Sequence, residues 1–169
     1  MNEDFTGKNV IGQNSDITFY DVNYKEEDRS SGSWISPPVS FTGSQSSYGS
    51  IQSNEVMITG SFTWMAAVKI DVLQAGPLYN VNVGDAFGAH VWVFQDALYM
   101  AVPDVVNGNH NQFFHSRLLE INTWYRFGAS WDVSTKTETL YVNGEVEEKV
   151  CPTCGSETVT SEDASLGVR

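Results

Sequence analysis

Apolar and polar residues alternate with a period of two along several short segments of this chain, most clearly between residues 122 and 144. The apolar positions of that segment are Tyr125, Phe127, Ala129 and Trp131. A period of two places every second side chain on the same face of a β-strand. The polar run 132–136 has turn chemistry, and residues 137–142 are rich in β-branched and aromatic side chains. The segment predicts two strands joined by a short turn.

A second turn follows at Asn143 and Gly144. Both residue types tolerate a positive φ, which the two central residues of a type I′ hairpin turn require. Residues 145–150 are therefore expected to form the partner strand of residues 137–142. Glu145, Glu147 and Glu148 in that strand are expected on a solvated face.

The same alternation predicts further strands along the chain. In residues 62–70, one face carries Phe62, Trp64, Ala66, Val68 and Ile70. Other strands are expected at 17–22, around Phe41, and at 48–51, 78–83, 88–95 and 97–102, and residues 113–120 lead into the segment 122–144. In the strand expected at 88–95, one face carries His90, Trp92 and Phe94, and the other face carries Val91 and Val93. Residues 103–112 predict a loop by composition. About ten to thirteen short strands with no helical stripe indicate a β-sandwich.

A Trp that opens a strand, an aspartate turn and the run Leu140-Tyr141-Val142-Asn143-Gly144 together resemble the laminin-G/pentraxin-like group of concanavalin A-like jelly rolls. The resemblance covers roughly residues 39–150. It implies an all-β fold, a two-sheet antiparallel jelly-roll β-sandwich, as a single domain over residues 1–169 with a polar N-terminal extension over 1–33. It also implies a secreted or extracellular binding module.

One departure from that group concerns the end of the chain. Such domains normally continue with a final strand after a segment like Leu166-Gly167-Val168, whereas this sequence stops at Arg169. Three expectations stay open: the C-terminal strand is missing, the N-terminal extension fills its place, or another segment or chain completes the sheet.

Charge and hydropathy narrow the range of partners. Nine basic residues against 21 acidic ones give a net charge of −12. That field repels phosphate backbones, so nucleic acid is excluded as a partner, and polyanions of the heparin type are disfavoured. No run of about 20 apolar residues is present, so no membrane insertion is expected. The first ten residues have no secretory signal pattern, so the chain either stays inside or has lost its signal peptide.

The cysteines Cys151 and Cys154 stand in a single Cys-Pro-Thr-Cys motif. A zinc ribbon would need a second such pair, and a thioredoxin-type motif would need a helix. We expect a disulfide that closes a small loop, in preference to two free thiols, and hence an oxidising compartment.

The resemblance also implies a calcium site. Calcium-binding laminin-G domains carry an aspartate in a stretch similar to residues 83–91, and Asp85 matches its position. The remaining ligands carried over from the family are the backbone carbonyls of Val102 and Leu118 and the side chain of Glu120. All of these are oxygen ligands, which calcium requires. The alternative is that Asp85 serves a Gly-Asp turn and Glu120 is a solvated charge. A pentraxin-type pair of calcium ions is not expected, because the acidic run for it is absent.

The expected loop is also a candidate ligand-binding segment. It contains the polar residues Asn107, Asn109, His110 and Asn111, followed by two Phe residues. Amides that hydrogen-bond hydroxyl groups and rings that stack on a sugar face are typical of sugar-binding sites. An ordinary loop has the same composition.

Catalytic patterns do not occur in the chain. Sandwich glycosidases of this superfamily carry an E-x-D-x-x-E strand that sets two carboxyl groups about 5 Å apart, and this sequence has none. We therefore expect a recognition or adhesion module that binds protein or carbohydrate through edge loops, with calcium as its cofactor. A structural or assembly domain of a larger matrix or particle and an unrecognised glycan-processing enzyme are the alternatives.

Overall fold

The computed structural model describes residues 5–7, 17–24, 39–42, 47–52, 57–58, 60–83, 86–104, 106–155, 159–160 and 163–166. In this part of the chain the regular structure consists of strands, and every strand pairing is antiparallel. The same residues contain no helix of the length and hydropathy that a membrane span needs. The predicted all-β class is confirmed.

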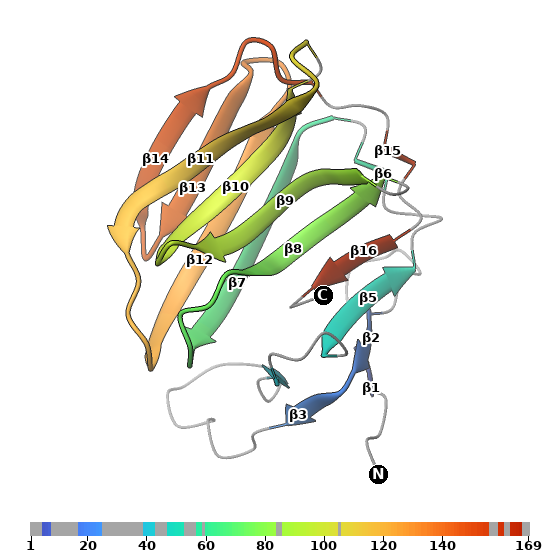
Figure 1. Cartoon of the computed structure of the whole chain (residues 1–169), viewed down its shortest axis with the longest axis vertical. Helices are drawn as coiled ribbons and strands as arrows, with labels where there is room; N and C mark the ends of the chain where they lie inside the picture. Colours follow the sequence, from blue (N-terminus) through green and yellow to red (C-terminus); the bar gives the residue numbers. More distant parts are fainter. Residues whose placement is uncertain are drawn as a thin grey trace.

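Two sheets make up the sandwich (Figure 1). The large sheet has the strand order β1 (Phe5–Gly7), β2 (Ile17–Tyr20), β5 (Tyr48–Gln52), β16 (Asp163–Leu166), β8 (Gly76–Val83), β9 (Ala86–Phe94), β10 (Ala97–Asp104) and β11 (Asn109–Leu118). The small sheet has the order β14 (Glu145–Val150), β13 (Thr137–Val142), β12 (Thr123–Asp132) and β7 (Phe62–Ile70). Two short ladders join β3 (Val22–Tyr24) to β4 (Val39–Phe41) and β6 (Met57–Ile58) to β15 (Val159–Thr160).

The alternation of apolar residues determines which faces meet. β12 pairs with β7 so that Tyr125 lies opposite Val68 and Ala129 opposite Trp64. Directly paired residues project from the same face of a sheet, so both apolar sets point the same way. Phe127 is fully buried on that face. The predicted inward and outward faces of β7 and β12 are confirmed.

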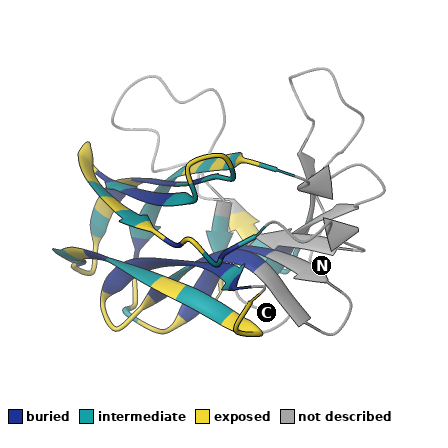
Figure 2. Cartoon of the chain, turned by 90° about the horizontal axis from the view of Figure 1, so that it is seen from above, coloured by how far each residue is buried: buried dark blue, intermediate teal, exposed yellow. Residues whose placement is uncertain are grey.

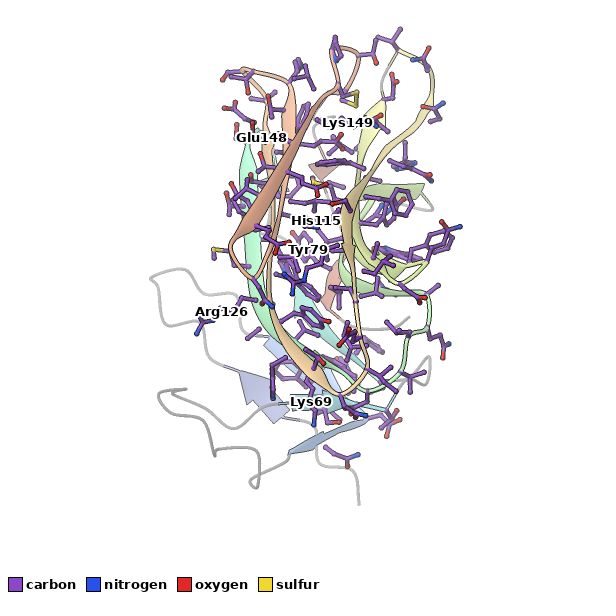
Figure 3. The ribbon with its side chains drawn as sticks, turned by 90° about the vertical axis from the view of Figure 1, so that its left-hand side faces the viewer. Lys69, Tyr79, His115, Arg126, Glu148 and Lys149 are labelled. Carbon is purple, nitrogen blue, oxygen red and sulfur yellow. A yellow bond between two sulfur atoms is a disulfide. The ribbon has the colours of Figure 1, made fainter. Side chains whose placement is uncertain are left out.

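The core lies between the two sheets, where the buried residues face each other (Figures 2 and 3). The large sheet contributes Tyr79, Val91, Val93, Leu98, Met100 and Val102, and the small sheet contributes Ile70, Tyr125, Phe127, Ala129, Trp131, Leu140 and Val142. Trp64 and Val68, which lie on the apolar face predicted for residues 62–70, are half-buried and pack against this core.

The predicted hairpin turn is present between β13 and β14. Asn143 has φ 51° and Gly144 has φ 89°, as a type I′ turn requires. Asn143 also ties the turn to β12, because its backbone N–H donates to the Arg126 carbonyl and its side-chain oxygen accepts from the Arg126 N–H. The turn therefore helps to fix the order of three strands.

The predicted loop over residues 103–112 is wrong at both ends. β10 continues to Asp104 and β11 begins at Asn109, so the connection is limited to residues 105–108. Composition misled the prediction because Asn and His are poor strand formers on average. Strand preference depends on the partners of each side chain, and here those polar side chains find partners on both faces of β11.

The C-terminal region contributes a strand to the large sheet. Residues Asp163–Leu166, expected to precede a final strand, themselves form β16, which pairs with β5 on one side and β8 on the other. The N-terminal strand β2 extends the sheet from the far side of β5. A strand from the C-terminal region is thus part of the large sheet, between β5 and β8.

Candidate functional site

The outer face of β8, β9, β10 and β11, directed away from the small sheet, carries a group of aromatic and amide side chains. Val91 and Val93 point into the core, so their neighbours on β9 project outward. Tyr99 on β10 lies opposite Trp92 on β9 and opposite Phe114 on β11, so these rings share the outer face. The aromatic face, as we name it, consists of Asn80, His90, Trp92, Phe94, Tyr99, His110, Gln112 and Phe114.

The rings of the aromatic face form one connected group. The ring centroids of Tyr99 and Phe114 are 4.8 Å apart, and Phe94 is 6.1 Å from Phe114 and 6.2 Å from Tyr99. His90 lies 5.5 Å from Tyr99 and 5.3 Å from His110. Such separations are those of favourable aromatic pairs, so three neighbouring strands hold a single ring surface.

Hydrogen bonds fix the orientation of these rings. The Trp92 indole N–H donates to Asn80 Oδ1 at 2.8 Å, and His90 Nε2 is hydrogen-bonded to the Tyr99 hydroxyl at 3.0 Å. Burial raises the pKa of Tyr99, against a hydrogen bond from Gln112 that lowers it. The phenol therefore stays neutral at physiological pH and its hydroxyl remains available for the hydrogen bond.

The members of the aromatic face differ in solvent exposure: some are buried beneath it, and others form its exposed surface. Asn80, His90 and Tyr99 are buried beneath their neighbours. Phe94 is 38% exposed and Gln112 is exposed, whereas Trp92, His110 and Phe114 are half-buried. The exposed ring surface is thus preorganised by buried partners, and an exposed amide lies beside it.

The structure separates the four predicted ligand-binding residues. His110 joins the aromatic face, but Asn111 points into the sandwich, where its amide donates to the Glu138 carboxylate. Asn107 donates to Asp104 Oδ2 at 2.8 Å, so its side chain stabilises the turn. Asn109 is exposed at the start of β11, opposite Asp104. The four residues do not form one binding loop.

The structure does not bring the predicted calcium ligands together either. Val102 lies opposite Asn111 and Leu118 opposite Ala97, so the two carbonyls are about five residues, roughly 16 Å, apart along the strand pair. Glu120 is exposed and lies beyond the Leu118 end. Calcium ligands must lie within about 2.6 Å of one ion, so Val102 does not fit a site with Leu118 and Glu120. Asp85 lies outside the described residues.

Within the described ranges, no group of three His, Cys, Asp or Glu side chains is arranged to hold a metal ion.

The predicted disulfide between Cys151 and Cys154 is present. The loop that the disulfide closes is attached to the turn between β10 and β11. Thr153 Oγ1 donates to Asp104 Oδ2 at 2.9 Å, and the backbone of Cys154 forms an isolated antiparallel β-bridge with that of Asp104. The hydrogen bond from Asn107 is the main cause that lowers the pKa of Asp104. Asp104 thus joins two loops at one end of the sandwich.

A buried polar group behind β11 escaped the sequence analysis. Glu138 is fully buried opposite Trp131, and burial raises the pKa of its carboxyl to about 7. Lys149 Nζ donates to Asn111 Oδ1 at 2.9 Å and to the Gln112 carbonyl at 2.7 Å. The signal was available, because Glu138 has the same parity as the core residues Leu140 and Val142 on β13.

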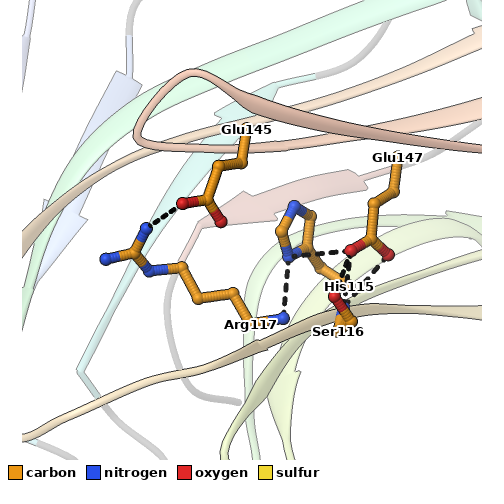
Figure 4. A network of polar contacts seen from close by, with 5 residues as sticks. All are labelled: His115, Ser116, Arg117, Glu145 and Glu147. Atoms are coloured by element: carbon orange, nitrogen blue, oxygen red, sulfur yellow. Dashed lines mark hydrogen bonds and ion pairs between the residues drawn. The ribbon is translucent and has the colours of Figure 1, made fainter.

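A second polar group closes the edge of the sandwich between β11 and β14 (Figure 4). Arg117 donates to Glu145 at 2.6 Å, and the Ser116 N–H and hydroxyl donate to the Glu147 carboxylate. His115 Nδ1 lies 3.8 Å from Glu147 and accepts the Arg117 N–H. Glu145 and Glu147 thus each bind a residue of β11 across the sandwich edge. The expected solvated face is confirmed for Glu145 and Glu148, which are exposed, whereas Glu147 is half-buried. Charges that point inward at edge strands oppose pairing with other chains.

Comparisons with solved structures place this arrangement among known folds. Domains LG4-5 of the mouse laminin alpha1 chain are 13% identical with a TM-score of 0.61, over 75% of this chain and 33% of that chain. The botulinum neurotoxin type G receptor-binding domain is 14% identical with a TM-score of 0.63, over 92% of this chain and 38% of that chain. The CBM40 module of the Ruminococcus gnavus IT-sialidase is 13% identical with a TM-score of 0.54, over 64% of this chain and 63% of that chain.

These similarities establish the fold, and the chain is a jelly-roll β-sandwich of the laminin-G and concanavalin A-like type. It spans about a third of the laminin structure and about two-fifths of the neurotoxin domain. No family model and no curated protein sequence matches the chain.

Proposed function

We propose that this chain is a carbohydrate-recognition module of a secreted protein and that the aromatic face is its binding surface. The observation that carries the proposal is the connected ring group of the aromatic face, in which His90 links Trp92 to Tyr99, and Tyr99 contacts Phe94 and Phe114. Trp92 is hydrogen-bonded to the buried Asn80, and Tyr99 to the buried His90. Rings stack on the apolar faces of sugars, and exposed amides such as that of Gln112 hydrogen-bond sugar hydroxyl groups. Preorganisation lowers the entropy lost on binding.

The solved relatives of this fold support a binding role over a catalytic one. The sialidase module was solved bound to α2,3-sialyllactose, and the neurotoxin structure is a receptor-binding domain. The aromatic face carries no pair of carboxylates among its described residues, and glycoside hydrolysis needs such a pair. The disulfide supports an oxidising, extracellular compartment.

The experiment is a glycan array probed with the intact chain and with two ring variants, Phe94→Ala and Trp92→Ala. We expect each variant to lose roughly 2- to 12-fold in affinity for the sugars that bind, because a stacked ring contributes about 0.5–1.5 kcal/mol. Trp124→Ala is the matched control, since Trp124 is 44% exposed on the small sheet, away from the aromatic face. Equal losses in all three variants, or binding that none of them weakens, would contradict the site.

A protein ligand is the second candidate function. One row across the small sheet aligns Met65 with Gly128, Tyr141 and Val146 on its outer face. Met65 is 77% and Val146 53% exposed, and exposed apolar groups favour protein contacts. Met65→Glu would weaken the binding of a protein partner to the small sheet and leave sugar binding at the aromatic face unchanged. This one variant therefore separates the two functions.

A further inference from the structure

The aromatic face carries no charged side chain among its described residues, although the whole chain has a net charge of −12. Its hydrogen-bonding groups are amides, imidazoles and a phenol from Asn80, Gln112, His90, His110 and Tyr99. Asp96, in the turn that follows Phe94, is the charged residue nearest to Phe94 along the chain, and it is acidic. The surface therefore offers ring faces and neutral polar groups.

The basic residues that the structure describes are engaged elsewhere. Lys149 donates to Asn111 and to the Gln112 carbonyl between the sheets, and Arg117 pairs with Glu145 at the sandwich edge. Lys136 donates to the Cys154 carbonyl in the disulfide loop.

Lys69 and Arg126 belong to the small sheet, on strands β7 and β12. Arg126 projects from the side of the small sheet away from the large sheet (Figure 3). None of these five side chains is directed to the aromatic face.

Charged and neutral sugars would need different partners on the aromatic face. A carboxylate or sulfate on a sugar loses water when it binds, and it needs a charge-assisted hydrogen bond to compensate. Near the aromatic face no described cation provides one, and the negative field of the chain opposes the approach of anions. A neutral hexose needs only ring stacking and neutral hydrogen bonds, which Phe94, Phe114 and Gln112 supply.

We propose that the aromatic face selects uncharged sugars and rejects their sialylated or sulfated derivatives. The proposal rests on the proposed carbohydrate-binding function and specifies its ligand class. It also distinguishes this chain from the sialidase module that was solved with sialyllactose, despite the shared fold.

The experiment uses matched pairs of neutral and sialylated oligosaccharides, including lactose and α2,3-sialyllactose, titrated against the intact chain by calorimetry. At about 0.15 M salt we expect the neutral member of a pair to bind at least roughly tenfold more tightly. Raising the salt concentration should narrow this difference without abolishing it, because screening removes the field but supplies no partner for the carboxylate.

A variant that gains affinity for charged sugars gives a second test, because misfolding can only cause a loss of binding. Gln112 is exposed on the outer face of β11, so Gln112→Arg places a guanidinium beside the rings. That variant should gain affinity for the sialylated members relative to the neutral ones, and the matched variant Gln112→Glu should not. A Gln112→Arg variant that keeps its circular dichroism spectrum and gains nothing would contradict the selection mechanism.

The outcomes separate the two proposals. Sialylated sugars that bind as tightly as neutral ones, with both losing affinity in Phe94→Ala, would overturn the selectivity and leave the proposed function standing. Failure of every neutral and charged glycan to bind would overturn the proposed function and this inference with it. Preference for neutral sugars that Phe94→Ala and Trp92→Ala both weaken would support both.

Discussion

At the scale of single residues, Trp131 and Glu138 project into the sandwich from paired positions of β12 and β13. Trp131 packs its ring into the core, whereas Glu138 brings a carboxyl group into the same interior. The Trp131 indole N–H and Glu138 Oε1 have no hydrogen-bond partner in the described part of the chain. A buried polar atom without a partner costs free energy in both side chains. For Trp131 the burial of the large apolar ring outweighs this cost, whereas Glu138 has a much smaller apolar part to offset it.

Replacement of Trp131 by Ala should lower the free energy of unfolding by about 3–5 kcal/mol, because the side chain is 1% exposed and its removal leaves a cavity. Urea unfolding followed by tyrosine and tryptophan fluorescence measures the change. Trp124→Ala, which shortens a 44% exposed ring on the same strand, should cost about 1 kcal/mol or less. Similar losses in the two variants would mean that Trp131 is not in the core.

Glu138 should make stability depend on pH. Burial raises the pKa of its carboxyl from 4.5 to about 7, so between these values the folded chain holds a proton that the unfolded chain releases. The contribution of the protonated Glu138 carboxyl to the free energy of unfolding is complete below pH 4.5 and is lost as pH rises through about 7. The loss amounts to about 3 kcal/mol.

Glu138→Gln should flatten this fall in the free energy of unfolding, measured by urea at pH values from about 5 to 8. Glu148→Gln is the matched control, because Glu148 is exposed on the neighbouring strand β14 and should leave the wild-type slope in place. Superimposable pH profiles for wild type and Glu138→Gln would refute the buried acid.

At the scale of elements, the hairpin β13–β14 and the loop that follows it hold one end of the small sheet. The hairpin depends on its turn, and the loop depends on its disulfide and on Asp104. The turn and the disulfide loop are each formed by residues close together in the sequence. Each nevertheless contacts a segment farther away in the chain, since Asn143 contacts Arg126 and Thr153 contacts Asp104.

Gly144→Val should destabilise the hairpin by about 1–2 kcal/mol, because a β-branched residue resists the positive φ of 89°. No atom lies within 4 Å of a Cβ built at this position, so the cost comes from the backbone and not from a clash. Gly144→Asn should cost less, since Asn tolerates positive φ. Chemical denaturation compares the three proteins, and equal stability of Gly144→Val and wild type would argue against the turn.

The disulfide Cys151–Cys154 closes a short loop, so its removal should cost about 2 kcal/mol by chain entropy. We expect reductant to lower the melting temperature of the wild-type chain and to leave a Cys151→Ser, Cys154→Ser double variant unchanged. Intact mass after alkylation of the non-reduced protein checks the pairing directly. Two alkylated thiols in that sample would overturn the argument for an oxidising compartment.

At the scale of the whole molecule, the net charge of −12 attracts cations and keeps anions away. Val102 lies far from Leu118 in the predicted calcium set and Asp85 lies outside the described residues, so calcium binding at Asp85 stays a prediction. If Asp85 binds calcium, binding to the folded chain should raise its melting temperature at roughly 0.1–1 mM calcium. Asp85→Ala should remove this rise, and identical melting in calcium and in chelator would remove calcium from the function.

Sequence and structure contributed differently to the fold. The strands with clean alternation, β7 and β12, were predicted with the correct faces, because burial of one face leaves a period of two in the sequence. β11 was misjudged because its polar residues face polar partners, so alternation in hydrophobicity is absent there. The order of strands, including β16 between β5 and β8, has no local signal at all.

Of the candidate site, the sequence determined which residues of β9 share the outer face: His90, Trp92 and Phe94. Register with β10 and β11 then brought Tyr99, Phe114 and His110 beside them, from positions that no local pattern relates. The period of a strand is encoded in consecutive residues, so the sequence alone reveals it. Which strand becomes a neighbour depends on the free energy of the whole packed sandwich, so only the tertiary structure decided that these rings form one surface.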